Sequence, residues 1–461
     1  MLNLTLEEVA KFSHGRINDP KFNDIKVDTI SIDTRTLEEG DVYMPIIGEK
    51  LDGHVFIEQA FERGAIASFH EENRDADFGN DRPIIYVEKT NKAFADLAEN
   101  YRKSLKDIKI IGITGSNGKT TTKDMIAQIL RTKFDVKKTL GNLNNEIGVP
   151  RTLLRFDQNT QIGVVEMGTD GPGQIEPLSR MACPDIAVFT NVGDTHLNIL
   201  KTKENIAKEK LHILDGLADE GVFIYNYDDE IIRNEVQTRS IKQRVITFGK
   251  DEGADYVIKI GASNNNGNSF TVNGTAYRTS YIGSHQVYNA TAAIIVAELL
   301  GLGVDDVNKA LEVNESTGMR SELINWKGFD ILNDSYKSNP QSLLSALDTL
   351  DILSGYTRKI AILGDMLELG DNEIELHREV GRKIDPKKVD YLLFYGDLSK
   401  YMAEEAAKNF PFEHVFHFDS KDKLNDKVKY LIQKNTLVLV KASRSLRLEE
   451  VVEALELICV K

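Results

Sequence analysis

Glycines, a lysine and threonines are concentrated in residues 112–122, Gly-Ile-Thr-Gly-Ser-Asn-Gly-Lys-Thr-Thr-Thr. Glycines let backbone N–H groups crowd around an anion, and a helix beginning directly after them adds partial positive charge. Lys119 would reach the outer phosphates of a nucleotide, and the Thr120 hydroxyl would bind Mg²⁺. A glycine-rich turn without an anion is the alternative, but the apolar run before it and the helical pattern after it favour a nucleoside triphosphate site. That site would comprise Gly115, Ser116, Asn117, Gly118, Lys119, Thr120 and Thr121.

A glutamate and a histidine stand at the ends of two further apolar runs. Glu166 lies near the end of the run 162–167, and His196 follows the run 186–190. Because parallel strands present their carboxyl ends to one crevice, Glu166 could hold Mg²⁺ beside Thr120. A solvated loop entry is the alternative for Glu166. A satisfied loop histidine is the alternative for His196, because magnesium prefers oxygen ligands.

Other polar groups have less distinctive spacing. A loop at 141–150 contains three amide side chains, Asn142, Asn144 and Asn145. These amides can donate hydrogen bonds to a sugar or peptide and accept hydrogen bonds from it. An ordinary turn is the alternative. Asn289 opens an alanine-rich helix, where it could read an adenine edge or simply occupy a polar helix start. Lys208 and Lys210 lie on a predicted helix at 204–214, and their spacing alone favours a charged helix face.

The apolar runs around these residues alternate with longer helical patterns. This alternation predicts a parallel sheet with helices on both faces. The predicted strands are 108–113, 162–167, 186–190, 222–225 and 245–248, and the helix after the glycine-rich turn is 120–130. An Asn- and Gly-rich patch at 261–274 predicts a hairpin in a more antiparallel portion.

The flanking regions predict one further α/β unit on each side. The first contains strands at 29–33 and 41–46, a helix near 56–63 and a polar loop at 71–81. The last alternates strands 331–333, 359–363, 391–395 and 437–440 with helices 341–350, 398–408 and 448–457, which predicts a Rossmann-like unit. The predicted class is therefore α/β with three domains, at 1–105, 106–317 and 318–461.

Length and charge narrow the function further. A chain of 461 residues is too long for a single domain with one ordinary hydrophobic core. The net charge of −15 argues against general nucleic-acid binding, which needs clustered cations. Two cysteines, Cys183 and Cys459, are too few for a disulfide framework or a zinc site. No signal-peptide core or long apolar run is evident, so we expect a cytoplasmic protein without a membrane span. We also expect a monomer.

Taken in order, these motifs resemble those of the Mur ligases of peptidoglycan synthesis over essentially the whole chain. The blocks are Asp33-Thr34-Arg35, Asp52-Gly53-His54, 114–123, 141–150, Glu166-Met167-Gly168, 190–197, Asn333-Asp334-Ser335-Tyr336, 363–370 and Lys441-Ala442-Ser443-Arg444. The asparagine-rich block and Gly-Asp-Met-Leu-Glu-Leu-Gly at 364–370 are the specific ones. The phosphate loop alone would also fit folylpolyglutamate synthases.

The resemblance implies roles for individual residues. Lys119, His196 and Lys210 match catalytic positions, and Thr120, Glu166, His196 and Lys210 match metal ligands. Lys210 lies fourteen residues after His196 and matches a carbamylated lysine that supplies anionic oxygens to a second Mg²⁺, with Lys208 as the fallback. Contacts to ATP are implied for the phosphate loop and for Asn289, Arg320 and Asp334. Contacts to the UDP-linked substrate are implied for Thr34, Arg35, Asn142, Asn144 and Asn145.

The activity that the resemblance implies is an ATP- and Mg²⁺-dependent ligase of peptidoglycan precursor synthesis. It would add D-alanyl-D-alanine to UDP-MurNAc-tripeptide through an acyl phosphate. A sibling that adds lysine or diaminopimelate is the alternative, although the Asp-Asn-Pro-Arg block typical of the latter is absent. A phosphate-loop ATPase or GTPase switch would explain Lys119 and Thr120, but not the two flanking domains.

Three positions depart from the family pattern. Gln286 stands where asparagine is frequent beside adenine, and Lys337-Ser338 replaces the more usual Asn-Ala before Asn339-Pro340. Ala442 and Ser445 replace glycines near the end of the chain. The last two departures lie where the dipeptide and domain closure would be handled.

Overall fold

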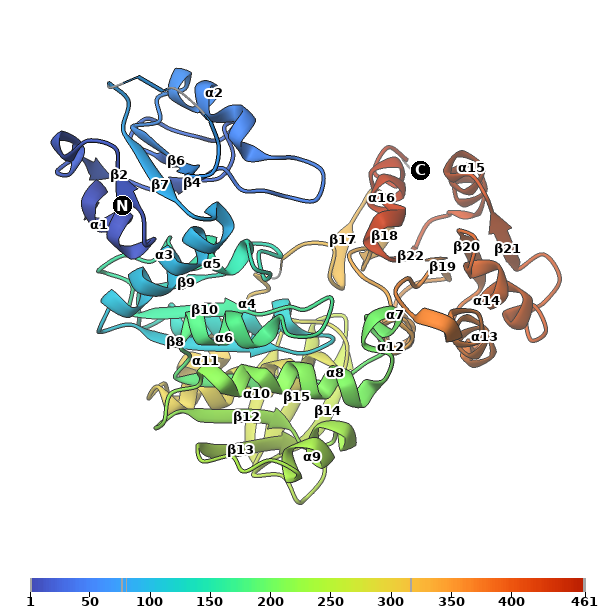
Figure 1. The fold of residues 1–461 in the computed structure, drawn as a ribbon. Coiled ribbons are helices and arrows are strands. Elements are labelled where there is room, and N and C mark those ends of the chain that lie inside the picture. Colours follow the sequence, from blue (N-terminus) through green and yellow to red (C-terminus); the bar gives the residue numbers. More distant parts are fainter. Residues whose placement is uncertain (1, 76–77, 80, 316, 459–461) are drawn as a thin grey trace.

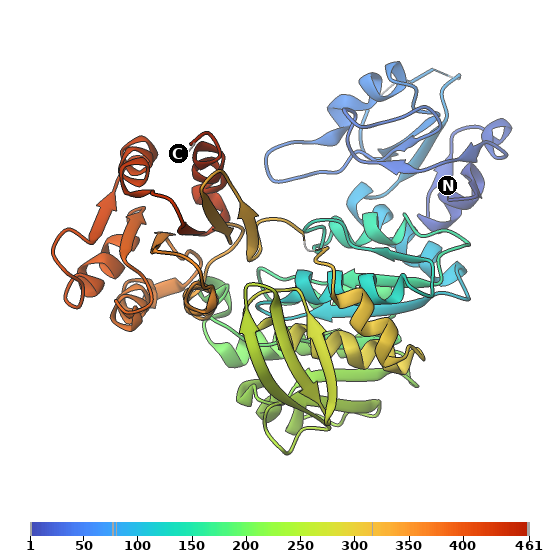
Figure 2. The same cartoon turned by 180° about the vertical axis from the view of Figure 1, so that it is seen from behind.

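The computed structural model describes residues 2–75, 78–79, 81–315 and 317–458. Three α/β units follow one another along the chain, as predicted, and Figures 1 and 2 show them from opposite sides. The first and last units both lie against the central one and stand apart from each other in these views. The predicted domain limits themselves stay a prediction. Among the described residues, no helix has the length and apolar character to span a membrane.

The first unit is built on a five-stranded sheet with the order β2-β7-β6-β5-β4, and its strands β1 and β3 form a separate two-stranded sheet. Its strands are β1 (Leu4–Thr5), β2 (Arg16–Ile17), β3 (Lys26–Val27), β4 (Ile30–Ser31), β5 (Val42–Tyr43), β6 (Ala67–Glu71) and β7 (Ile84–Val87), and its helices are α1 (Leu6–Phe12), η1 (Pro20–Phe22), η2 (Gly53–Phe56), α2 (Ile57–Glu62) and α3 (Thr90–Ser104). The strands predicted at 29–33 and 41–46 are confirmed but shorter. Part of the loop predicted at 71–81 lies outside the described residues.

The central unit contains a nine-stranded sheet, parallel from β9 to β14 and antiparallel from β14 to β16. Its strands, in spatial order, are β9 (Val136–Lys138), β10 (Ile162–Glu166), β8 (Lys109–Thr114), β11 (Ile186–Phe189), β12 (Val222–Asn226), β13 (Arg244–Gly249), β14 (Tyr256–Asn264), β15 (Gly267–Val272) and β16 (Thr275–Thr279). The five predicted strands and the predicted hairpin are confirmed.

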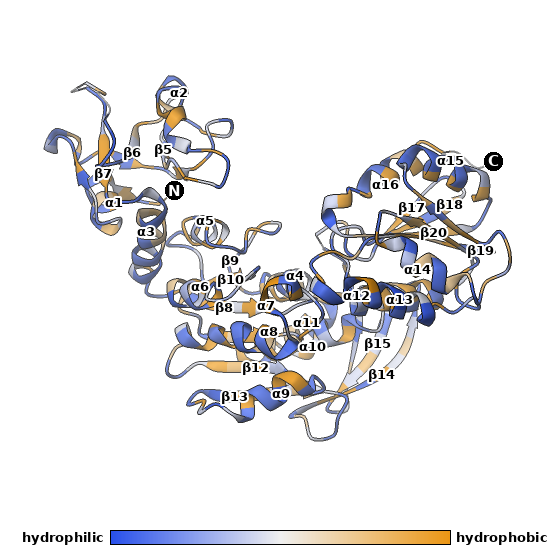
Figure 3. Cartoon of the chain, turned by 45° about the vertical axis from the view of Figure 1, so that its right-hand side comes forward, coloured by the Kyte–Doolittle hydropathy of each residue, from blue (hydrophilic) through white to orange (hydrophobic). Residues whose placement is uncertain are grey.

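Helices cover both faces of this sheet. Successive strand residues point to opposite sides, and both sides carry apolar residues that pack against helices. Ile111 packs with α4 (Lys119–Leu130), α10 (Gln286–Leu299) and α11 (Val304–Leu311). Ile110 packs on the other face with α5 (Gly148–Leu153), α6 (Ile175–Ala182), α8 (Lys203–Lys210) and η3 (Leu211–Gly216), in a cluster that also holds α3 and the core of the first unit. Figure 3 shows apolar residues along β8 and β12. The unit is completed by α7 (Leu197–Leu200) and α9 (Glu230–Gln237).

The C-terminal unit has a six-stranded sheet that is parallel except at β17. Its strands, in spatial order, are β17 (Glu322–Asn325), β18 (Phe329–Asn333), β22 (Thr436–Lys441), β19 (Arg358–Gly364), β20 (Tyr391–Tyr395) and β21 (Val415–Phe418). Its helices are α12 (Pro340–Ile352), η4 (Gly370–Asn372), α13 (Glu373–Lys383), α14 (Ser399–Ala406), α15 (Lys421–Leu431), η5 (Arg444–Leu446) and α16 (Glu449–Leu455). The predicted strands and helices are confirmed, with α13, α15 and the edge strands β17 and β21 in addition.

Candidate functional site

Three neighbouring strands bring the predicted site together. Strands β10, β8 and β11 are adjacent. Glu166 is the last residue of β10, and the segments that follow β8 and β11 carry the phosphate loop and His196. A cavity of about 820 Å³ lies at this edge, between the central and C-terminal units. Most of the predicted residues line it: Ser116, Asn117, Gly118, Lys119, Thr120, Thr121, Asn142, Asn144, Asn145, Glu166, His196, Asn289, Arg320 and Asp334. Gly115, Lys210, Thr34 and Arg35 do not.

The turn between β8 and α4 needs glycine at two positions. Gly115 has φ +148°, and a Cβ there would lie 1.9 Å from Thr190 Oγ1. Gly118 has φ +79°, and a Cβ there would lie 2.4 Å from Asn289 Oδ1. The Ser116 N–H donates to the Asn191 carbonyl oxygen at 2.8 Å. The loop is therefore held against the segment after β11.

Lys119 lies over its own loop. Its Nζ donates to the carbonyl oxygens of Gly115 and Ser116, at 2.7 and 3.4 Å. Burial lowers the pKa of Lys119 to about 8, with Glu166 opposing and Lys337 reinforcing this shift. A partly buried ammonium that lines the cavity and is paired here with carbonyl oxygens is suited to receive phosphate oxygens.

The residues predicted to hold Mg²⁺ beside the loop supply oxygen donors. Thr120 Oγ1 donates to Glu166 Oε2 at 2.9 Å, and Asn144 Nδ2 donates to Glu166 Oε1 at 2.8 Å. Both Thr120 and Glu166 are buried. Hydroxyl and carboxylate oxygens are the ligands that Mg²⁺ prefers, so this pair fits the ion. Lys123, one helical turn after Lys119, is fully buried with its Nζ 3.7 Å from Glu166, and no distinctive sequence signal marked it.

His196 connects the central unit to the C-terminal one. Its Nδ1 lies 2.9 Å from Glu368 Oε2, and its Nε2 lies 3.1 Å from Lys337 Nζ. Burial lowers the pKa of His196, which favours the neutral imidazole. The hydrogen bond with His196 lowers the pKa of Glu368 to about 2, so this carboxylate is charged. His196 therefore donates from Nδ1 to Glu368 and accepts at Nε2 from Lys337. Neither partner was predicted as a site residue.

Lys210 and Lys208 have opposite environments on α8. Lys210 is 1% exposed, whereas the side chain of Lys208 is 55% exposed and lies 3.8 Å from Glu235. Burial holds the pKa of Lys210 well below its ordinary value, and the cations Lys119 and Lys337 lower it further. Lys210 is therefore the lysine of the two whose neutral amine is favoured.

The predicted substrate residues differ in how their polar groups are used. Asn145 Oδ1 accepts the Gly148 N–H at 2.9 Å where α5 begins, so part of its function is structural. In the first unit, Thr34 Oγ1 donates to Gln59 Oε1 at 2.7 Å, and Arg35 pairs with Asp33 at the surface. The substrate-binding assignments stay a prediction.

The predicted ATP contacts beyond the loop lie on two units. On α10, Asn289 accepts from Thr122 Oγ1 at 3.2 Å and donates to Gln286 at 2.8 Å, so both ends of its amide are used. In the C-terminal unit, Arg320 lies 3.9 Å from the centre of the Tyr336 ring. Asp334 pairs with Lys441 at 2.7 Å.

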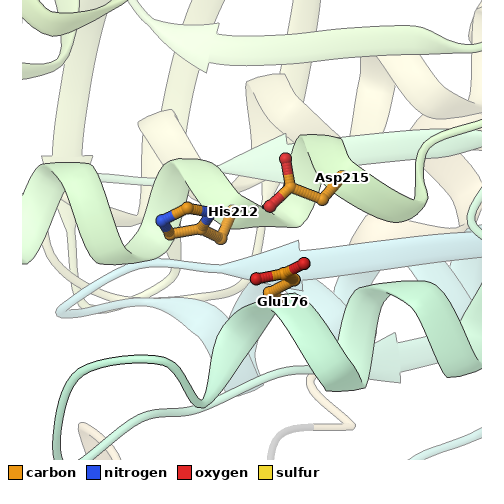
Figure 4. A group of neighbouring side chains, drawn as sticks. All are labelled: Glu176, His212 and Asp215. Atoms are coloured by element: carbon orange, nitrogen blue, oxygen red, sulfur yellow. Dashed lines mark hydrogen bonds and ion pairs between the residues drawn. The ribbon is translucent and has the colours of Figure 1, made fainter.

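A second group of candidate metal ligands lies outside the cavity. Glu176 on α6 and His212 and Asp215 on η3 present atoms within 4.8 Å of one another (Figure 4). Each element already supplies a partner, because His212 Nδ1 lies 2.6 Å from Asp215 Oδ2 on η3 and Glu176 lies 2.9 Å from Arg180 on α6. We interpret the group as local polar contacts within η3 and within α6.

Family models match all three units of the chain. The Mur ligase family catalytic domain matches residues 26–102, the Mur ligase middle domain matches 113–297, and the Mur ligase glutamate ligase domain matches 319–444.

Curated proteins and solved structures match at full length. The UDP-N-acetylmuramoyl-tripeptide–D-alanyl-D-alanine ligase of Bacillus subtilis is 39% identical over 99% of both chains, and that of Escherichia coli is 30% identical over the same share. A MurF crystal structure from Acinetobacter baumannii superposes with a TM-score of 0.88 at 27% identity over 99% of both chains. A Thermotoga maritima MurF in complex with ADP gives 0.82 at 29% identity, covering 94% of this chain and 98% of that one.

Proposed function

The chain belongs to the Mur ligase family, and from this premise we propose that it is an ATP-dependent ligase that joins D-alanyl-D-alanine to UDP-MurNAc-tripeptide in peptidoglycan precursor synthesis. The observation that carries the proposal is the full-length likeness to UDP-N-acetylmuramoyl-tripeptide–D-alanyl-D-alanine ligases. It includes the C-terminal unit, which would receive the incoming dipeptide. We keep the predicted monomeric state and cytoplasmic location as predictions.

In the proposed reaction, the terminal carboxylate of the tripeptide attacks the γ-phosphorus of ATP. ADP leaves with the electron pair of the broken bond, and an acyl phosphate forms. The dipeptide amine then attacks the acyl carbon and loses a proton, and phosphate leaves. Lys119 and the N–H groups at the start of α4 would bind the phosphate oxygens. The C-terminal unit would exclude water from the acyl phosphate.

We propose that Thr120 and Glu166 hold one Mg²⁺, and that His196 and Lys210 belong to a second site. Bound magnesium supplies positive charge for the phosphate oxygens. Asn144 orients Glu166 through their 2.8 Å hydrogen bond. Asn289, Arg320 and Asp334 would contact the rest of ATP, and Thr34 and Arg35 the uridine nucleotide.

We also propose that Lys210 carries a carbamate. A neutral amine adds to CO₂ and releases a proton, and the burial of Lys210 favours that neutral amine. Lys210→Ala should lose about 100-fold or more in turnover, whereas Lys208→Ala should stay near wild type. Incubation with ¹³CO₂ should give a carbamate NMR signal in the wild type and in the Lys208→Ala variant. A signal that persists in Lys210→Ala would contradict the assignment.

The proposed activity is tested by phosphate release from Mg-ATP with UDP-MurNAc-tripeptide, with and without D-alanyl-D-alanine, and by product mass. We expect turnover that needs both co-substrates and a pentapeptide product. Turnover that needs a free amino acid instead would indicate a sibling ligase. Phosphate release with neither co-substrate would indicate an unrelated ATPase.

A further inference from the structure

Lys337 brings a positive charge from the C-terminal unit into the cavity. It follows β18 and precedes α12, and its backbone carbonyl accepts from Lys441 Nζ at 2.9 Å, which holds the segment in place. Its side chain crosses to the central unit, where Nζ lies 3.1 Å from His196 Nε2. Within its own unit, Nζ also lies 3.4 Å from Glu368 Oε2.

The ammonium of Lys337 occupies a position suited to a cation. His196 donates from Nδ1 to Glu368, so the lone pair on Nε2 faces Lys337. This nitrogen is the atom that His196 would offer to a metal ion, so Lys337 must leave it when the proposed second Mg²⁺ binds. A cation therefore stands next to the phosphate loop on the side of the C-terminal unit.

The positive charges near Lys337 are only partly neutralised by the carboxylate that contacts it. Lys337 and Lys119 line the same cavity, together with Arg320. The positive charge of Lys337 also lowers the pKa of Lys119. Glu368 is a carboxylate in contact with Lys337, but it is shared with His196. Several cations around one open cavity are suited to a polyanion, and the phosphate loop defines where its phosphates would lie.

We propose that Lys337 is a further catalytic residue, whose ammonium contacts the γ-phosphoryl group of bound ATP from the C-terminal unit. This inference rests on the proposed function. Lys337 donates hydrogen bonds to the phosphoryl oxygens as the bond to ADP breaks and the bond to the carboxylate forms, and it transfers no proton. Because Lys337 belongs to one unit and the loop to another, phosphoryl transfer is favoured only when the two units are in contact.

The contact is tested by comparing affinities for ADP and for a non-hydrolysable ATP analogue, both measured by calorimetry. In Lys337→Gln, the preference for the analogue should fall about tenfold relative to wild type, while ADP affinity stays the same. Lys337→Arg should retain most of the preference. Lys434→Gln is the matched control, because it removes an exposed lysine of the same unit that does not line the cavity.

Steady-state kinetics supply the second measurement. Lys337→Gln should lower kcat at least tenfold at saturating ATP and Mg²⁺. An unchanged preference for the analogue would overturn the inference, because Lys337 would then act on domain packing alone. Tighter analogue binding in Lys337→Gln would also overturn it, because Lys337 would then only block His196. Failure of the wild type to make a dipeptide-dependent product refutes the proposed function instead, independently of these binding results.

Discussion

Glu166 is the residue on which the proposed metal site beside the phosphate loop depends. Glu166→Gln keeps the shape of the side chain but removes the charge that would hold Mg²⁺ beside Thr120. We expect kcat to fall about 100-fold or more, and the gain in nucleotide affinity on adding Mg²⁺ to shrink. Glu220→Gln, at an exposed position outside the cavity, makes the same chemical change and should be neutral. An equal loss of nucleotide affinity in EDTA and in Mg²⁺ would argue for misfolding of the site.

Asp52 makes the first unit sensitive to acid. Burial alone would raise its pKa, but hydrogen bonds from His54 and Arg74 outweigh burial and lower the pKa to about 2. A carboxylate with a depressed pKa stabilises the folded state above its ordinary value of 3.8, and this contribution is lost as the pH falls through about 2.

Asp52→Asn should therefore lower the free energy of unfolding by about 1 kcal/mol at pH 7, after allowing for solvent screening. Thermal midpoints of wild type and variant, measured from pH 7 downwards, should differ most above about pH 4 and converge toward pH 2. A difference that does not change with pH would show that the carboxylate charge is not responsible.

At the scale of elements, the turn from β8 to α4 depends on the absence of a side chain at Gly115. Gly115→Ala would place a Cβ 1.9 Å from Thr190 Oγ1 at φ +148°. We expect nucleotide affinity to fall at least tenfold while the circular dichroism spectrum stays the same, because the strain is confined to the loop. Gly274→Ala is the matched control, since Gly274 also has positive φ, +81°, but has no atom within 4 Å of the added Cβ. Equal effects of both variants would contradict a steric cause.

The helices and strands that could be predicted are those whose secondary structure follows from the pattern of their own residues. The runs at 108–113 and 162–167 are apolar except for Lys109 and Glu166, and the glycine-rich turn lies directly before a helix, so the local pattern suffices to predict both. A parallel sheet also places the carboxyl ends of its strands at one edge, whereas the order β10-β8-β11 was not predicted. Lys337 was noted as a departure from the family pattern and Glu368 lies in the block 364–370, but their contacts with His196 could not be found in this way. Their contact with His196 depends on how two units meet, and no periodicity within either segment encodes that.

At the scale of the whole molecule, the C-terminal unit is also held at a point outside the cavity. In the turn between β14 and β15, Asn265 Nδ2 donates to the Ser354 carbonyl oxygen at 2.8 Å, and the Ser354 N–H donates back to Asn265 Oδ1 at 2.9 Å. This reciprocal pair joins the central unit to the segment after α12. It lies apart from the groups expected to touch substrate.

Asn265→Ala should therefore favour separation of the two units without changing the chemistry. Each lost hydrogen bond contributes about 1 kcal/mol, so the loss of both costs about 2 kcal/mol, and the ratio of separated to contacting molecules should rise about 30-fold. We expect a larger radius of gyration by small-angle scattering and a lower turnover that saturating substrates partly restore. Asn266→Ala, the next residue of the same turn, should behave as wild type. An unchanged radius of gyration in Asn265→Ala would exclude this contact as a tether.

The first unit and the C-terminal unit are attached to the central unit by different kinds of contact. Helix α3 lies in the same apolar cluster as one face of the central sheet, and Tyr101 and Arg102 donate to the carbonyl oxygens of Phe156 and Ala182. The C-terminal unit keeps core clusters of its own, to which the central unit adds Ile282. The first and central units therefore share one hydrophobic core, whereas the C-terminal unit packs mainly on a core of its own. Under the proposed function, the shared core would fix the distance between the nucleotide end of one substrate and the phosphates of the other, and contact with the C-terminal unit would set when the third reactant meets them.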